Sequence, residues 1–236
     1  MRFSRFLQGV KAELPLLVGV APFGMIYGVL AIQAGIIKIQ AQAMSSIIFA
    51  GSSQIVFTQL VLESAPGLVI VVAVLVVNLR HALYSAWMAP YLQRLSRGWK
   101  LLLAYLLTDE AYVVSAIHYE KLGYAELHPT FEREFQHYYL FGAGLALWTT
   151  WQVSTAFGLF LGTVIPSSWS LDFTLALTFI ALVVPNLRDR AGVITAVSAG
   201  VVAVLATNLP YKVGLVIAVV IGVVAGMLME KGSAEK

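Results

Sequence analysis

Charged side chains stand inside two neighbouring apolar segments of the sequence. Arg80 lies well inside the apolar run 66–92, and Asp109 and Glu110 lie in the middle of the run 99–117. If these runs cross a lipid bilayer, each unpaired charge there costs about 3 kcal/mol or more. We therefore expect Arg80 to pair with one acid, and the other acid to bind a proton reversibly or to hold the ammonium group of a substrate.

The segment NLRHALY around Arg80 surrounds this charge with further polar groups. Arg80 and Tyr84 are four residues apart, and Asn78 and His81 are three apart, so each pair shares a face of a helix. A planar guanidinium suits a carboxylate, which either an amino-acid substrate or Asp109 would supply. The alternative is that an Arg80–Asp109 pair only fixes the register of two helices and binds nothing.

A second polar cluster, Gly51 to Gln54, lies inside the apolar run 43–62. Small residues let helices pack closely, so the cluster is consistent with packing alone. It is equally consistent with a helix that is broken near Gly51 and exposes backbone groups to a polar substrate. From these residues we predict two sets: substrate contacts from Gly51, Ser52, Ser53, Gln54, Asn78, Arg80 and Asp109, and proton coupling by Glu110, Asp109 or His81.

Two other segments carry weaker signals. In APFGMIYG, Pro22 removes a backbone donor and Gly24 leaves space beside it, which predicts a kinked helix. Gln152, Ser154 and Thr155 follow an aromatic-rich stretch and are minor candidates.

The elements that must position these residues are membrane helices. The chain has 236 residues, of which 59% are hydrophobic and 11% charged, and its mean hydropathy is +0.84. A soluble domain carries about 25% charged residues. A transmembrane helix needs roughly 20 apolar residues, so we expect an all-α, polytopic membrane protein with about 7–8 transmembrane helices and a single transmembrane domain over 1–236.

Eight apolar windows divide the chain at 14–36, 43–62, 66–92, 99–117, 138–165, 169–187, 191–207 and 211–229. Long stretches such as LVIVVAVLVV do not alternate, which favours helices over barrel strands. We interpret residues 1–13 as a cytoplasmic amphipathic lead-in and 118–137 as the longest loop outside the membrane. Eight crossings from a cytoplasmic N-terminus place nine Lys and Arg inside and five outside, which favours this orientation. A re-entrant second window gives seven on each side, so charge does not settle the number of spans.

The sequence lacks the motifs of several classes of enzyme and metal site. The chain has no Cys, and His118, His128 and His137 lack metal-ligand spacing. The sequence contains no Walker A, GxSxG or HExxH motif, so we expect no catalytic residue, metal or cofactor, and an ion gradient or the substrate's own gradient as the energy source. The basic residues between apolar runs suit topology and lipid contact better than nucleic acid.

The order of these segments resembles a known family. APFGMIYG, FAGSSQ, LVVNLRHALYSAWMAPYL and LLTDEAY, with LVVPNLRDR and NLPYKVG later, resemble the AzlC-type large subunit of bacterial branched-chain amino acid exporters. The resemblance implies export of leucine, isoleucine, valine or related amino acids across the cytoplasmic (inner) membrane of a prokaryote, with a small hydrophobic AzlD-type subunit as partner. The matching positions are Pro22, Phe23, Gly24, Gly51, Ser52, Gln54, Asn78, Arg80, His81, Thr108, Asp109 and Glu110.

We therefore expect a secondary transporter that binds a zwitterionic amino acid, with Arg80 near its carboxylate and Asp109 or Glu110 near its ammonium group or carrying the coupled proton. The alternatives are a membrane-embedded enzyme, for which His81 and Asp109 would be the reactive pair, and a non-transporting assembly subunit.

Overall fold

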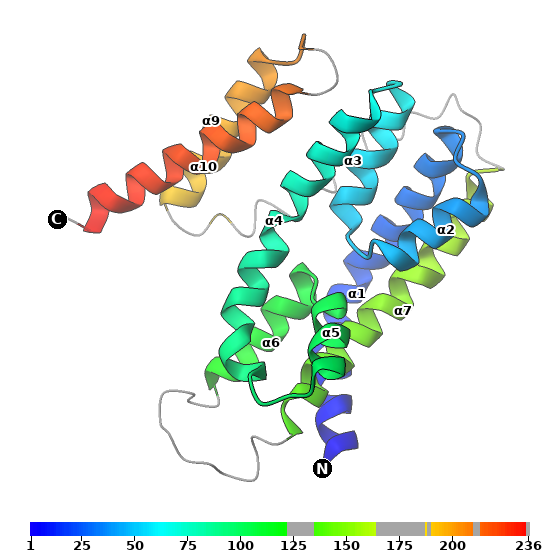
Figure 1. Ribbon diagram of the computed structural model, residues 1–236, viewed down its shortest axis with the longest axis vertical. Coiled ribbons are helices and arrows are strands. Elements are labelled where there is room, and N and C mark those ends of the chain that lie inside the picture. The colour runs from blue at the N-terminus through cyan, green and yellow to red at the C-terminus, as the bar shows by residue number, and fades with distance from the viewer. Residues whose placement is uncertain (122–134, 164–186, 188–189, 210–212, 235–236) are drawn as a thin grey trace. The chain divides into compact units, whose positions relative to one another are not determined.

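The computed structural model describes residues 1–121, 135–163, 187, 190–209 and 213–234, and regular structure in these ranges is helical (Figure 1). The all-α prediction is therefore confirmed. The helices are α1 (Arg2–Gln33), α2 (Lys38–Ile47), α3 (Gly51–Leu62), α4 (Gly67–Leu92), α5 (Arg97–Leu106), α6 (Asp109–Lys121), α7 (His137–Leu161), α9 (Arg190–Leu205) and α10 (Val213–Ala234).

Three of the described helices are long and apolar enough to cross a bilayer: α1, α4 and the Val213–Glu230 part of α10. The pair α5 and α6 makes a fourth candidate if it is counted as one broken span, bent by 118°. These helices agree with a helical membrane protein. The number of seven or eight spans stays a prediction, since window 169–187 lies outside the described residues except for residue 187.

Contacts group the chain into two units, each described here by itself. The first contains residues 1–58 and 77–166, and the second contains 59–76 and 167–236. In the second, α9 and α10 pack closely because Gly222 of α10 faces α9, where a Cβ atom would lie 2.8 Å from the Ala199 Cβ. The single transmembrane domain over 1–236 stays a prediction.

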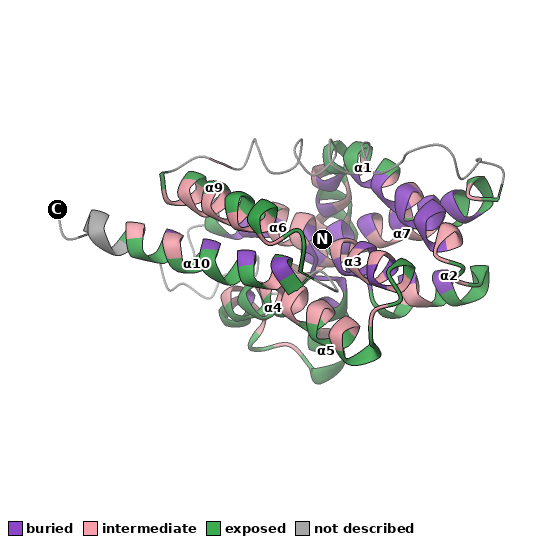
Figure 2. Ribbon diagram, turned by 90° about the horizontal axis from the view of Figure 1, so that it is seen from above, coloured by how far each residue is buried: buried purple, intermediate pink, exposed green. Residues whose placement is uncertain are grey.

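Helices α1 and α7 pack together at the core of the first unit, and Figure 2 shows many of its buried residues on these two helices. Gly142 of α7 lies against Phe6, and Gly158 lies against Met25, so the two helices run parallel. A Cβ atom on Gly28 would lie 2.6 Å from the Leu159 backbone nitrogen. We call this contact the α1–α7 glycine seam; it has the small-residue character of close helix packing in membranes.

Two apolar windows are each divided into two helices. Residues 48–50 separate α2 from α3, and residues 107–108 separate α5 from α6. Of the two interpretations of Gly51 to Gln54, packing alone or a broken helix, the first break agrees with the broken helix, since α3 begins at Gly51. The continuous helix expected over 99–117 was wrong: the chain breaks before Asp109, and both Asp109 and Glu110 occupy the first turn of α6, where the helix dipole stabilises negative charge.

Other predicted boundaries fall within longer helices. Helix α1 begins at Arg2 and contains Pro22 without interruption, so the lead-in 1–13 belongs to the same helix and the kink at Pro22 stays a prediction. A Cβ on Gly24 would lie 3.0 Å from the Ser154 Oγ, which places Gly24 against α7. Helix α6 continues to Lys121 and α7 begins at His137, so both ends of the predicted loop 118–137 are helical. Residues 122–134 of this loop lie outside the described residues.

The glycine seam can be tested at Gly28. A Gly28→Ala variant should be less stable by about 1–3 kcal/mol, because the added methyl group meets the α7 backbone and forces the helices apart. The matched control is Gly19→Ala in the same helix, where a Cβ has no neighbour within 4 Å and where the change should be neutral or stabilise by up to about 1 kcal/mol. Thermal unfolding in detergent measures both; equal stability of Gly28→Ala and the wild-type protein would contradict the seam.

Candidate functional site

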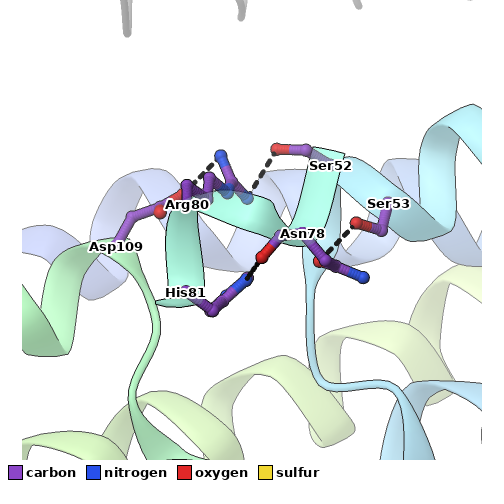
Figure 3. A network of polar contacts seen from close by, with 6 residues as sticks. All are labelled: Ser52, Ser53, Asn78, Arg80, His81 and Asp109. Atoms are coloured by element: carbon purple, nitrogen blue, oxygen red, sulfur yellow. Dashed lines mark hydrogen bonds and ion pairs between the residues drawn. The ribbon is translucent and has the colours of Figure 1, made fainter. Parts of the chain in front are cut away.

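Arg80 is the centre of a polar network close to the middle of α4 (Figure 3). Its Nη1 lies 2.9 Å from Asp109 Oδ2 of α6, and its Nη2 donates a hydrogen bond of 3.2 Å to the Ser52 Oγ of α3. The ion pair that the sequence predicts between Arg80 and Asp109 is therefore present. One guanidinium joins the start of α3, the middle of α4 and the start of α6.

Asn78 forms the second part of the network. Its Oδ1 accepts a hydrogen bond of 2.7 Å from the Ser53 Oγ, and its backbone oxygen lies 3.3 Å from His81 Nδ1. Ser52 and Ser53 thus contact two different residues of α4. Two neighbouring hydroxyl groups thus hold the start of α3 against α4.

Aromatic pairs hold α6 beside α4 and so bring Asp109 to Arg80. The rings of Tyr84 and Tyr112 stack with centroids 4.5 Å apart, and those of Tyr91 and Tyr119 stack at 4.9 Å. The two pairs succeed one another in the same order along both helices, so α4 and α6 run parallel there. Stacked pairs of this kind contribute about 0.5–1.5 kcal/mol each.

The network leaves hydrogen-bonding capacity unused. Among the described residues, four buried polar atoms of this region have no hydrogen-bond partner: Arg80 Nε, Asp109 Oδ1, Thr108 Oγ1 and Gln54 Nε2. Each unmet group costs about 1–3 kcal/mol. These four atoms are themselves buried, but the Arg80 and Asp109 side chains are 30% and 37% exposed as a whole, so other atoms of the pair are accessible to a polar ligand.

Gly51 and Gln54 face α7 rather than α4. Gln54 is fully buried, and its Oε1 accepts a hydrogen bond of 3.0 Å from Trp151 Nε1. A Cβ atom on Gly51 would lie 2.6 Å from the Trp151 ring. Of the four residues from Gly51 to Gln54, the first and last therefore contact α7. Ser52 and Ser53 contact α4 and join the ion-pair network.

The break between α2 and α3 is supported by side chains from α7 and α5. Gln152 Nε2 donates to the Ser45 backbone oxygen at 3.0 Å, and the Tyr105 hydroxyl donates to the Ser46 backbone oxygen. These carbonyls belong to the last turn of α2, which has no partners inside its own helix. Gln152 Oε1 also accepts hydrogen bonds from Gln42 at 2.8 Å and from the Ser46 hydroxyl at 2.9 Å.

Sequence reasoning gave Gln152 little weight and did not select Tyr105. An amide inside an apolar segment was the available signal for Gln152, whereas an aromatic ring at position 105 gave none. It also did not select Glu13, which is fully buried on α1, because residues 1–13 were assigned to a lead-in. Glu110 lies beside Asp109 and is half-buried.

The geometry suits the recognition of a small zwitterion, a molecule that carries one positive and one negative charge. Arg80 and the first turn of α3 supply positive potential, and Asp109 supplies negative charge beside it. Interrupted helices whose ends meet at ionisable residues are typical of binding sites in secondary transporters. The side chains of this network are groups that can bind a ligand. The His81 Nδ1 already lies within hydrogen-bond distance of the Asn78 backbone oxygen.

Comparisons with known proteins identify the family of this chain. The family described as AzlC protein matches residues 15–165. An "Uncharacterized membrane protein" of Archaeoglobus fulgidus is 31% identical over 85% of this chain and 84% of its own length. The "Inner membrane protein YgaZ" of Escherichia coli is 24% identical over 85% of this chain and 81% of its own.

A second "Uncharacterized membrane protein", from Helicobacter pylori, is 29% identical over 75% of both chains. No solved structure matches the chain. The matched family region contains the described network, with both interrupted helices and the ion pair. The chain is a membrane protein that belongs to the AzlC protein family.

Proposed function

We propose that this chain is a secondary transporter subunit that exports branched-chain or other hydrophobic amino acids across the cytoplasmic membrane, driven by an ion gradient. The observation that carries the proposal is the partly exposed Arg80–Asp109 ion pair. It lies where α3 and α6 begin after their breaks. Membership of the AzlC family and the resemblance to exporter subunits support the substrate class.

A zwitterionic amino acid matches both members of the pair. Its carboxylate would bind Arg80 and the hydroxyl of Ser52, and its ammonium group would bind Asp109, with Asn78, Ser53 and the start of α3 around it. Such a substrate would replace the internal ion pair by two new ones, so no charge remains uncompensated. The Arg80–Asp109 contact then marks the site without substrate, and loading opens it.

The relatives support the proposed location, and the sequence supports the proposed energy source. The Escherichia coli relative is named an inner membrane protein, and we extend that location, with several crossings, to this chain. The sequence has no Walker A motif for ATP hydrolysis. We propose that a proton gradient drives export, with Glu110 as the proton-binding acid and Asp109 or His81 as the alternatives.

Breaking the ion pair tests the site. Arg80→Ala should remove transport and destabilise the protein, because Asp109 loses its counter-ion. Removing one partner of a buried pair costs about 3–5 kcal/mol, and since both side chains are about a third exposed we expect a smaller loss of about 1–2 kcal/mol. Adding Asp109→Asn should restore part of the assembly but not transport, measured as yield in detergent and as amino-acid uptake into vesicles.

The matched control for this test is Arg94→Ala, since Arg94 is an exposed arginine that follows α4. It should change neither yield nor uptake. Normal assembly and normal transport in both Arg80→Ala and Asp109→Asn would remove the ion pair from the proposed site.

Replacing Glu110 tests the proton. Glu110→Gln should abolish the acceleration of export by a pH gradient while exchange at equal pH continues, because exchange needs binding and alternation but no net proton movement. Fluorescent or isotope-labelled amino-acid flux in vesicles, with and without a pH gradient, measures the difference. An unchanged response would move the assignment to Asp109 or His81.

Co-purification tests the partner. We propose that a small hydrophobic AzlD-type membrane subunit binds this chain, as the family resemblance implies. The tagged chain, expressed with the small membrane protein encoded beside it, should yield a stable complex in mild detergent, whereas an unrelated small membrane protein should not remain bound. Full transport by this chain alone in a host without such a gene would contradict an obligatory partner.

A further inference from the structure

Glu13 of α1 is a buried acid that the proposed site does not yet use. Its side chain is fully buried, and neither carboxylate oxygen has a hydrogen-bond partner among the described residues. An ionised carboxylate in such surroundings costs several kcal/mol or more. Burial without a partner therefore favours the neutral, protonated form of Glu13.

The packing of α1 places Glu13 at the level of the second break. One turn earlier on the same face, Gly9 lies against Tyr139 and Ala143 of α7. The next residue of α7, Gly144, lies against Leu106, where a Cβ would be 2.8 Å from the Leu106 Cβ. Leu106 is the last residue of α5. Because α1 and α7 run parallel, Glu13 lies near the level at which α6 begins.

The charges that face Glu13 come from two other helices. On α6, which contacts α1, the carboxyl of Glu110 repels a charge on Glu13. On α7, the Tyr139 hydroxyl is subject to the field of Glu13, and the His118 ring of α6 stacks on Tyr139 at 3.8 Å. Glu110 in turn interacts with Asp109 and Arg80. A series of charges thus leads from the buried acid to the ion pair.

A second buried group points to the same place. Thr108 completes the break before α6, is 7% exposed, and its Oγ1 has no hydrogen-bond partner among the described residues. A hydroxyl group accepts and donates hydrogen bonds, so it can stabilise either state of a neighbouring acid. The break therefore contains a polar group without an assigned partner at the level of the two glutamates.

We propose that Glu13 and Glu110 form one coupled proton-binding site, in which one of the two carboxyl groups holds the proton that drives export. Two carboxylates in a medium of low dielectric do not both ionise, so the pair keeps at least one proton and titrates as a unit. Uptake adds one proton to a carboxylate oxygen and release removes it, with no other bond changed. The coupling of this proton to export rests on the proposed function, whereas the joint titration of the two acids does not.

Infrared difference spectra of the purified protein across a pH range test the pair without transport. The wild-type protein should show a carbonyl band of a buried protonated carboxyl group that Glu13→Gln removes. Glu110→Gln should keep that band but shift the pH midpoint at which it disappears, because a repelling carboxylate has gone. The matched control, Glu120→Gln, replaces an exposed acid of α6 and should change neither. An unchanged band in Glu13→Gln, or an unchanged midpoint in Glu110→Gln, would overturn the pair.

Flux measurements connect the pair to export. Glu13→Gln should lose the response to a pH gradient, as should Glu110→Gln, and the double variant should lose no more than either one alone, since the two acids act as a unit. If the wild-type protein shows the coupled titration but moves no amino acid, the pair stands and the proposed function fails. If Glu13→Gln does not fold, Glu13→Asp keeps the acid and should retain the band at a changed midpoint; a band at the wild-type midpoint would contradict the pair.

Discussion

The constraint on which the first unit depends is that an arginine inside an apolar helix must be paired. Arg80 meets this requirement through Asp109 at 2.9 Å and Ser52 at 3.2 Å. These contacts determine where α3 and α6 begin relative to α4. The acid is available because α6 starts at Asp109, so the break in the chain and the ion pair depend on one another. A continuous helix through this segment would not present Asp109 in a first turn, where the dipole also favours its charge.

Breaks in membrane helices expose backbone groups, and each group needs a partner since lipid offers none. For α2 those partners come from Gln152 and Tyr105, which cover carbonyls of its last turn. Trp151 then contacts both the glycine and the glutamine that begin α3. Helix α7 is therefore the support on which the first break is built. The ion pair fixes one side of α3, and α7 fixes the other.

Structural features that depend on the charge or polarity of single residues could be predicted from the sequence. A charge in an apolar run requires an opposite charge, so the Arg80–Asp109 pair was predictable. The run of small polar residues left two interpretations open, close packing or a break near Gly51, and the structure has the break. The break at Leu107 was not, because leucines continue up to it and only the tertiary contacts favour a new helix at Asp109. The burial of Glu13 was hidden for a related reason: Lys11 and the basic residues near it suggested an aqueous lead-in, while the glycine seam draws that part of α1 against α7.

The glycine seam also determines which parts of the first unit change shape together. Where the backbones of two helices touch through Gly28, Gly142 and Gly158, sliding one helix by a single residue would place a full side chain where only a hydrogen fits. The packing of α1 against α7 is therefore restricted to one register. The short helices on either side of the two breaks, α2 and α3, and α5 and α6, are joined by two or three residues that are not helical. A rotation of these short helices around their breaks would change the surroundings of Arg80 and leave the α1–α7 packing as it is.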